Sequence, residues 1–383
     1  MTGREKQIID LITLNPLISQ DEIAAKLKIT RSSVSVYITN MMKKGLIVGR
    51  GYILDKEKDS FPVCVGTLAV DFFGYIEGDS EDKILFDNAD LQISYGGCAK
   101  NLAENLSLLD YKPLVISAVG NDVLGKELLN ECTREGIDVS NVEEIKEKNT
   151  ASYLEIRRPN NSLYMGLSNW RIDYELTPDV FRGKHRILNK ADKIIIDDSI
   201  PVESIKYLSQ TYGKSRLVLQ STARLPIIKD VISTLGLLIT DAAYLADMFE
   251  IKIEGRDMDT SLTKEIALKL KQADVTDCLF TFGRESLCWY HDNKLYCSNA
   301  KFNDLLTEQP IHKRFGTARA AITAVMIYAM DRSYPVESIL RHVACARHHV
   351  AVYGRISSYL LTPDFISRHL DHLEDNLQIF PIY

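Results

Sequence analysis

The sequence predicts an α/β protein in which a mostly parallel, doubly wound sheet follows a small helical unit at the N-terminus. Three observations support this prediction. The chain has 383 residues, which is more than one ordinary compact domain. From about residue 60 onward, near-continuous apolar runs typical of buried parallel strands alternate with helical stretches. The first 54 residues differ, because they combine short helical patterns with an excess of basic side chains.

Charge separates these two parts of the chain. Residues 1–54 carry 8 Lys and Arg against 4 Asp and Glu, whereas the rest carries 38 against 48, and together they give the net charge of −6. A small basic unit on an acidic body indicates that any contact with nucleic acid is made by the N-terminal unit.

The overall composition is that of a soluble globular protein, with 45% hydrophobic and 26% charged residues. No run of 18 apolar residues occurs, so we expect no membrane span, and the N-terminus lacks the apolar core of a signal peptide. Seven cysteines without a C-x-x-C spacing predict reduced thiols in a cytoplasmic protein, with neither a disulfide framework nor a zinc site.

Three short helices are predicted in the N-terminal unit, residues 1–57. The first covers residues 4–15. The second follows Ser19, which has Glu22 three positions on, the spacing of a capping box. The third is capped by Thr30 and stopped by Gly45. Its inward stripe is predicted to consist of four residues: Val34, Ile38, Met41 and Met42.

A wing is predicted to close this unit, as two short β segments in residues 46–54. Three helices followed by a wing resemble a winged helix-turn-helix, which implies double-stranded DNA as a partner. The third helix would present short donors and a methyl group to a major groove: Arg31, Ser32, Ser33, Ser35, Val36 and Thr39. Phosphate contacts are expected from Lys43, Lys44 and Arg50. The alternative is a winged helix that binds protein and has an ordinary polar face.

The body, residues 58–383, follows a charged linker at 54–62. Its strands are predicted in five apolar runs: 113–120, 191–199, 216–222, 235–242 and 277–283. In such a sheet the ligand binds at the carboxyl ends of the strands. Residues 150–170 predict a hairpin instead, and together with residues 85–97 they are expected to form a small β-lid.

Motifs in the body resemble those of the ribokinase-like (PfkB) carbohydrate and nucleoside kinases. These motifs are GTLAVD ending at Asp71, GGCAKNLAENLSLL with Gly96, Gly97 and Asn101, and GNDVLG at 120–125. Their order and spacing match over about residues 60–365, and the stretches around them are most similar to pseudouridine kinases. A winged helix fused to such a kinase is an arrangement found in bacterial relatives.

The resemblance implies a ligand-binding half of the pocket. Asp71 would accept hydrogen bonds from sugar hydroxyls, the turn at Gly96 and Gly97 would let the backbone approach the ligand, and Asn101 would orient the sugar. Each residue also has a purely structural interpretation, because an Asp after a strand often caps a helix and a glycine pair often only forms a turn.

The catalytic motif departs from the family pattern D-T-x-G-A-G-D, whose last Asp takes the proton from the acceptor hydroxyl. Aligned on Gly316 and Thr317, this chain has Lys313 in place of the first Asp, Ala318 in place of the second glycine, and Arg319 in place of the base. Arginine stays protonated in proteins and cannot accept a proton.

Two further motifs of the nucleotide half are also altered. The family's N-x-x-E, which helps to place metal and phosphates, reads Asp241-Ala-Ala-Tyr244 here. The nucleotide-side T-x-G-x-x-G keeps Thr281 and Gly283 but ends in Ser286. Loss of the base, the glycine and the metal-positioning acid together predicts a pseudokinase.

The predicted function is therefore a dimeric transcriptional regulator whose pseudokinase body senses a sugar- or nucleoside-like effector. Helix amides with Lys313, Gly316, Thr317 and Arg319 would form an anion site, and the hypothesis that follows is an already phosphorylated effector. In the alternative, Arg319 fills vacated space or pairs with a nearby acid. No cofactor is required in this interpretation. In a second interpretation the protein is instead a kinase that uses ATP and Mg²⁺, and in a third the body serves only as a dimerisation scaffold.

Overall fold

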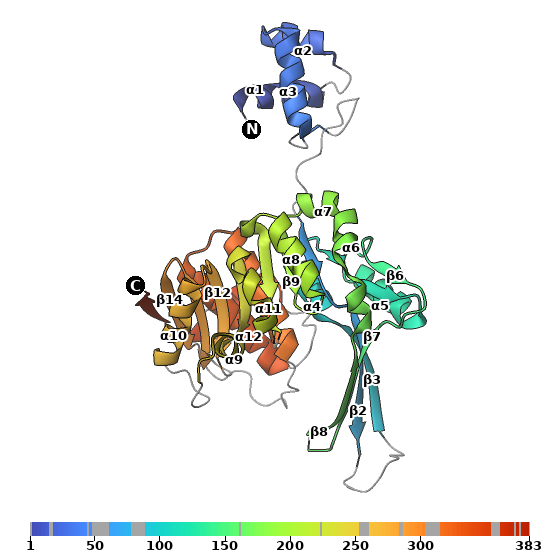
Figure 1. Ribbon diagram of the computed structural model, residues 1–383, viewed down its shortest axis with the longest axis vertical. Coiled ribbons are helices and arrows are strands. Elements are labelled where there is room, and N and C mark those ends of the chain that lie inside the picture. Colours follow the sequence, from blue (N-terminus) through green and yellow to red (C-terminus); the bar gives the residue numbers. More distant parts are fainter. Residues whose placement is uncertain are drawn as a thin grey trace. The chain divides into compact units, whose positions relative to one another are not determined.

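The computed structural model divides the chain into two compact units, residues 1–60 and residues 61–383 (Figure 1). The sequence boundary was expected at residues 57 and 58. The structure describes the following residues: 2–14, 18–43, 46–47, 61–77, 89–160, 162–222, 224–252, 260–282, 286–299, 301–302, 315–353, 361–370, 373–374 and 377–382.

The N-terminal unit contains the three expected helices, α1 (Gly3–Leu14), α2 (Gln20–Leu27) and α3 (Arg31–Lys43). α2 begins with the expected capping box: the Glu22 amide donates to Ser19 Oγ at 3.2 Å, and the Ser19 amide donates to Glu22 Oε2 at 2.8 Å. The buried apolar residues that join the helices are Ile8, Ile12, Ile18, Ile23, Val34, Ile38, Met41 and Ile47. Met42 was wrongly placed in this core, because it is 44% exposed on the outer side of α3. The predicted wing beyond Ile47 lies outside the described residues.

A sheet of nine strands forms the centre of the second unit in the described residues, in the order β17-β14-β13-β12-β11-β10-β9-β1-β4. The strands from β12 to β4 are parallel, whereas β13, β14 and β17 are antiparallel. Their bounds are β1 Pro62–Val65, β4 Leu114–Ile116, β9 Lys193–Asp197, β10 Leu217–Gln220, β11 Leu237–Asp241, β12 Asp277–Phe282, β13 Ser286–His291, β14 Lys294–Asn299 and β17 Leu377–Pro381.

Helices cover both faces of this sheet, as a doubly wound fold requires. One face packs against α4 (Cys98–Leu108), α5 (Val123–Arg134), α11 (Phe315–Asp331), α12 (Val336–Tyr353) and α13 (Pro363–Leu370). The other packs against α6 (Pro178–Gly183), α7 (His185–Lys190), α8 (Val202–Thr211), α9 (Ala242–Phe249) and α10 (Thr260–Gln272). The predicted mostly parallel sheet is confirmed. The run at 113–120 forms two strands rather than one, since β5 (Ala118–Gly120) leaves the main sheet to pair with β6 (Glu143–Ile145).

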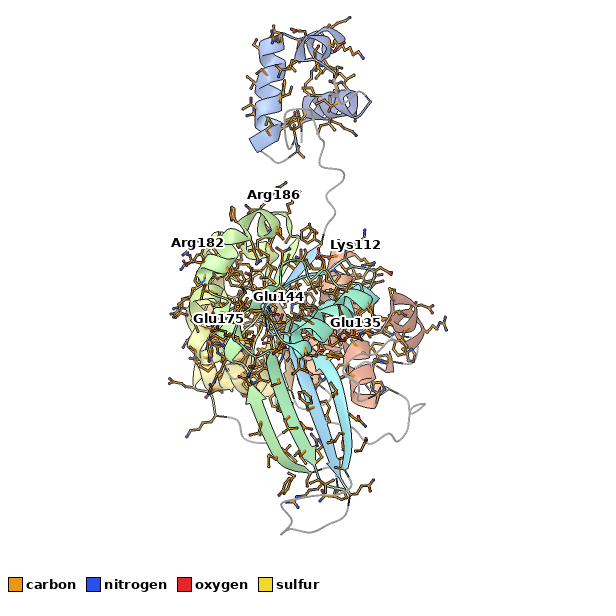
Figure 2. All side chains as sticks on the ribbon, turned by 90° about the vertical axis from the view of Figure 1, so that its right-hand side faces the viewer. Lys112, Glu135, Glu144, Glu175, Arg182 and Arg186 are labelled. Carbon is orange, nitrogen blue, oxygen red and sulfur yellow. The ribbon has the colours of Figure 1, made fainter. Side chains whose placement is uncertain are left out.

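Four strands project from the sheet as a lid, with the order β3-β2-β7-β8 (Figures 1 and 2). They are β2 (Ala69–Ile76), β3 (Ala89–Gly96), β7 (Ala151–Arg157) and β8 (Leu163–Asn169). The expected lid segments correspond to β3, β7 and β8. The strand that the sequence did not assign to the lid is β2, which carries Asp71.

None of the helices in the described part of the chain is long and apolar enough to cross a membrane.

Candidate functional site

The candidate site lies along the edge of the sheet where the parallel strands end. β1 ends just before Gly66 and Thr67, β9 ends at Asp197, and β11 ends at Asp241. The carboxyl ends of parallel strands meet at one edge, so these polar residues lie in a row next to the base of the lid. The motif residues of the sequence analysis fall at the two ends of this row.

Asp71, Gly96 and Asn101 come together at the lid end of the row. The structural interpretation supposed that Asp71 caps a helix. Asp71 instead lies inside β2 and caps none. A Cβ added to Gly96 would lie 2.7 Å from Asp71 Oδ2 and 3.8 Å from Asn101 Oδ1. A side chain at this position would require the Asp71 carboxylate to move. The position of Gly96 therefore brings the backbone close to both polar groups.

The Asn101 side chain is aimed into this end of the site from α4. Asn101 is only 8% exposed, and its Oδ1 has no hydrogen-bond partner among the described residues. Buried carbonyl oxygens of this kind are nearly always hydrogen-bonded in native proteins. Its acceptor is therefore available to a donor on a bound ligand.

Gly97 has a separate, structural reason to be glycine. Its φ is +99°, and a Cβ there would lie 2.3 Å from the carbonyl oxygen of Thr67. The same carbonyl accepts a hydrogen bond from the Ala99 amide at 3.2 Å, which fixes the first turn of α4 against the end of β1. The glycine pair thus does more than form a turn, because it sets how closely α4 approaches the strand ends.

A chain of buried hydrogen bonds, which the sequence analysis missed, connects the sheet edge to the segment after the lid. Thr67 Oγ1 lies 2.6 Å from Asp173 Oδ2 and 2.7 Å from Ser199 Oγ, and its single hydroxyl hydrogen can serve one of the two at a time; Ser199 Oγ donates to Asp197 Oδ2 at 3.0 Å. Asp173 belongs to a 3₁₀ helix, η1 (Arg171–Glu175), that directly follows β8. Within the described part of the chain, Asp173 Oδ1 has no hydrogen-bond partner.

Burial raises the pKa of both carboxyl groups in this series of hydrogen bonds, Asp173 and Asp197. It raises the pKa of Asp173 to about 7, against the opposing effect of the hydrogen bond from Thr67. It also raises the pKa of Asp197 to about 6, to which the neighbouring charge of Asp198 adds. The Asp198 carboxylate has a structural role, since its Oδ2 accepts hydrogen bonds from Ser221 Oγ at 2.8 Å and from the Thr222 amide at 2.7 Å.

Arg319 is paired with an acid at the other end of the row. Its Nη2 donates to Asp241 Oδ2 at 3.1 Å, and Asp241 Oδ1 accepts a hydrogen bond from Thr281 Oγ1. The side chains of Arg319 and Asp241 are 11% and 32% exposed, so solvent screens the pair in part. Of the two interpretations left open by the sequence, pairing with a nearby acid describes this arginine.

Cys98 lies close to both Asp197 and Arg319. Burial raises the pKa of the Cys98 thiol, the Asp197 charge raises it further, and the Arg319 charge lowers it. Arg319 thus lies near the N-terminus of α4 and also contacts Asp241. The ligand half and the catalytic half of the expected pocket therefore lie along the same edge of the sheet, with Cys98 within electrostatic range of Arg319.

Several predicted site residues fall where the structure gives no side-chain detail. Gly316 and Thr317 lie in the first turn of α11, whose side chains are not described there, and Lys313 and Gly283 lie outside the described residues. In the N-terminal unit the Lys43 side chain is not described, and Lys44 and Arg50 lie outside the described residues.

The outer face of α3 is exposed, as a DNA-reading helix requires. Its exposed residues include Arg31, Ser32, Ser35, Val36 and Thr39. Ser33 differs from them, because it is half-buried and its amide and hydroxyl bond to the Thr30 side chain at the helix start. Ser33 therefore takes part in the N-terminal cap of α3.

The GNDVLG motif is structural. Asp122 caps α5 by accepting from the Gly125 amide at 2.7 Å, and it also accepts from the Thr150 amide and hydroxyl. A Cβ at Gly120 would lie 2.3 Å from the Lys148 carbonyl oxygen. The motif therefore anchors α5 to the start of β7.

Across the described residues, no group of three or more His, Cys, Asp or Glu side chains could hold a metal ion.

This fold and site define a small-molecule kinase architecture joined to a DNA-binding domain. Residues 60–304 match the model of the pfkB family of carbohydrate kinases, and residues 1–48 match that of a winged helix-turn-helix DNA-binding domain. The chain therefore belongs to the PfkB family and carries a winged helix-turn-helix head.

Similar proteins are named as kinases. Over 352 residues the chain is 27% identical to the uncharacterized sugar kinase YeiI of Escherichia coli, covering 90% of this chain and 93% of that protein. Pseudouridine kinase of the same bacterium is 25% identical over 181 residues, 46% of this chain and 53% of that enzyme. A solved carbohydrate kinase from Agrobacterium tumefaciens superposes with a TM-score of 0.69 at 15% identity, covering 84% of this chain and all of that one, a likeness of fold alone.

Proposed function

We propose that this protein is a DNA-binding regulator whose PfkB-type body binds a sugar- or nucleoside-like effector without phosphorylating it. The observation that carries the proposal is the ion pair between Arg319 and Asp241. It occupies the place where the resemblance puts the general base and the metal-positioning residue.

The pair opposes catalysis in two ways. A guanidinium cannot take the proton of an acceptor hydroxyl, and general-base catalysis is worth about 10² to 10⁴ in rate. Asp241 already binds both Arg319 and Thr281, so among the described residues this carboxylate is not available to help place a metal ion and phosphates. Electrostatic stabilisation of the phosphates contributes even more than the base to the rate of phosphoryl transfer, so a weaker contribution from Asp241 opposes catalysis further.

The ligand half favours an effector rich in hydrogen-bond donors. Asp71 and the Asn101 Oδ1 are acceptors, and sugar hydroxyls or base N–H groups are the donors that complement them. The sequence alone suggested a phosphorylated effector bound by Arg319. Because Asp241 already compensates the Arg319 charge, we expect the unphosphorylated form to bind at least as well.

The lid supports a homodimer as the working unit. Residues paired directly across strands point to the same face of a sheet. Two such rows on one lid face are wholly apolar: Ile93, Phe72, Leu154 and Leu167, then Leu91, Gly74, Ile156 and Met165. Leu91 is 77% exposed. An apolar face of this size is typical of a protein interface, and a second copy of the same face can cover it with two-fold symmetry.

The dimer gives the effector a route to DNA. Two winged-helix heads bind two half-sites of a pseudo-palindromic operator at a spacing that the dimer sets. An effector that binds one arrangement of the two bodies more tightly than another shifts that spacing. Effector binding then changes DNA affinity without any chemical step.

Titration of the full chain with paired ligands tests this function. Calorimetry would compare pseudouridine with its 5′-phosphate and ribose with ribose 5-phosphate, while a parallel assay measures ADP release. The proposal expects binding of at least one free ligand and no ligand-dependent ADP release. Ligand-dependent turnover would favour the second candidate, a PfkB kinase with a DNA-binding head, to which the 27% identity with a named sugar kinase points.

A further inference from the structure

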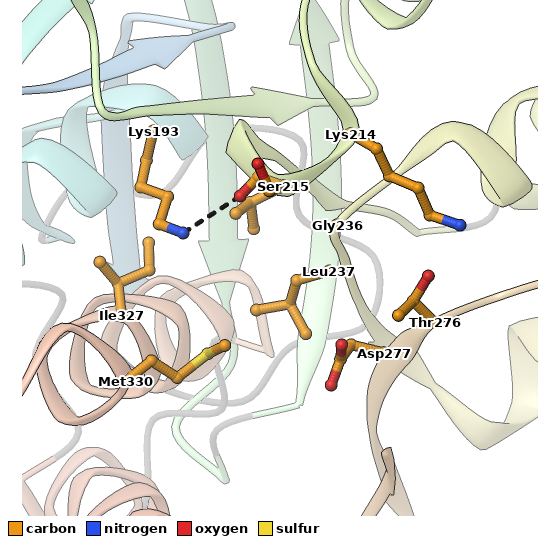
Figure 3. Close-up of a pocket in the computed structure, with 10 residues that line it drawn as sticks. Lys193, Lys214, Ser215, Gly236, Leu237, Thr276, Asp277, Ile327 and Met330 are labelled. Atoms are coloured by element: carbon orange, nitrogen blue, oxygen red, sulfur yellow. Dashed lines mark hydrogen bonds between the residues drawn. The ribbon is translucent and has the colours of Figure 1, made fainter. Parts of the chain in front are cut away.

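A second pocket opens at the opposite edge of the sheet, where the parallel strands begin (Figure 3). It has a volume of about 430 Å³ and lies between the starts of β9, β10, β11 and β12 and the last turns of α11. Ligand pockets of proteins typically measure about 300–1,000 Å³ and combine apolar walls with a few polar groups. The site around Asp71 and Arg319 lies at the other ends of these strands.

The floor of this pocket is apolar and firmly packed. Val218, Leu237 and Ile327 line it, and all three are buried members of the core between the sheet and α11. Gly236 shapes the wall, because a Cβ there would lie 2.5 Å from the Lys214 carbonyl oxygen. The cavity is therefore bounded by fixed elements and can hold a flat ring or a short chain.

Two lysines supply positive charge on either side of Leu237 (Figure 3). Lys193 Nζ donates to the Ser215 carbonyl at 3.2 Å, and Lys214 Nζ donates to the Asp274 carbonyl at 3.3 Å. Each ammonium has three N–H donors, and these bonds to neutral carbonyls use one of them. Within the described part of the chain neither amine forms an ion pair, so both keep donors and charge to offer a ligand.

The acid that lines the pocket does not cancel this charge. Asp277 Oδ1 accepts hydrogen bonds from Trp289 Nε1 at 3.1 Å and from His291 Nδ1 at 2.5 Å. The bond to Asp277 also raises the pKa of His291. Asp277 is thus bonded to Trp289 and His291, and it forms no ion pair with either lysine among the described residues.

We propose that this pocket binds a small organic anion, with an apolar ring or chain against Leu237 and Ile327 and a carboxylate or phosphate held by Lys193, while Lys214 adds positive charge on the other side of Leu237. A charge-assisted bond to the Lys193 ammonium group orients the ligand, and the apolar floor supplies contact area. The site is separate from the one around Asp71, so this inference does not depend on whether the body phosphorylates its ligand.

Calorimetry with the full chain and three probes tests the proposal: indole-3-acetate, phenyl phosphate and uncharged indole-3-acetamide. We expect at least one anion to bind about tenfold or more tighter than the amide. The double variant Lys193→Gln, Lys214→Gln should lose this preference. A matched variant with two other lysines changed, Lys126→Gln and Lys206→Gln, should keep it.

The two anions distinguish a carboxylate ligand from a phosphorylated one, since the tighter of them identifies the headgroup. A second variant, Met330→Trp, should block the anion by filling the cavity, while its thermal unfolding shows whether it is folded. Three results would overturn the proposal: no binding of any probe, equal affinity for the anion and the amide, or unchanged anion affinity in the folded Lys193→Gln, Lys214→Gln protein.

Discussion

Asp173 and Asp197 make the stability of the body depend on pH in an unusual direction. Both are buried where the lid joins the sheet, and burial raises the pKa of both, to about 7 for Asp173 and about 6 for Asp197. The folded state therefore binds protons more tightly than the unfolded state does. The stability contributed by protonated Asp173 is fully present below its unfolded pKa of 3.8 and is lost as the pH rises through about 7.

The size of the effect follows from the shift in pKa. One pKa unit corresponds to about 1.4 kcal/mol, so Asp173 alone removes roughly 3 kcal/mol of unfolding free energy between pH 5 and 8. At about 2 cal/mol/K of unfolding entropy per residue, a body spanning residues 61–383 loses roughly 4 °C in Tm. Asp197, whose pKa is about 6, adds to this loss in the same direction.

Thermal unfolding of wild type and Asp173→Asn at several pH values measures the contribution. Asn mimics the protonated acid and can still accept from Thr67, so the variant should be more stable than wild type at pH 8 and similar to it at pH 5. An exposed acid, changed in Asp179→Asn, serves as the control. Buried His349, whose pKa is about 4, affects both proteins equally and drops out of the difference. A parallel fall of Tm in Asp173→Asn and wild type would refute the reasoning.

Three further predictions concern the ligand half, the lid and the head. Gly96→Ala places a methyl 2.7 Å from Asp71 Oδ2 and should weaken effector binding about tenfold or more in calorimetry, whereas unchanged affinity would remove Gly96 from the site. Ile93→Glu places a charge on the exposed lid face and should convert the proposed dimer to a monomer in sedimentation analysis; a dimer that persists would mean another interface. Arg31→Ala should cost about 1–3 kcal/mol of operator affinity in a DNA-binding titration, while Lys126→Ala on the body should cost nothing.

Local patterns predicted the elements that local physics determines. The apolar run of β9 is buried on both faces, as its Ile-rich sequence indicates, and Ser19 with Glu22 forms the predicted capping box. The resemblance also placed Asp71, Gly96 and Asn101 together correctly, although Asp71 lies within a lid strand. The antiparallel strands β13, β14 and β17 were not predicted, because β17 joins them from the far end of the chain.

Long-range partners were beyond sequence reasoning for the same reason. Thr67 and Asp173 are 106 positions apart, and no local pattern connects them. The pairing of Arg319 with Asp241 joins two altered motifs 78 positions apart, and the sequence could only pose it as an alternative. The lysine-lined pocket likewise combines the starts of four separate strands.

Arg319, paired with Asp241, is proposed to leave a body that binds its ligand but does not phosphorylate it. The most direct measurement is ADP release by the full chain with MgATP and millimolar pseudouridine, uridine, inosine, ribose or fructose. We predict rates equal to the protein-free background for every ligand that calorimetry shows to bind. ADP release that saturates with one ligand, reaches about 1 s⁻¹ or more and disappears in Asp71→Ala would contradict the account.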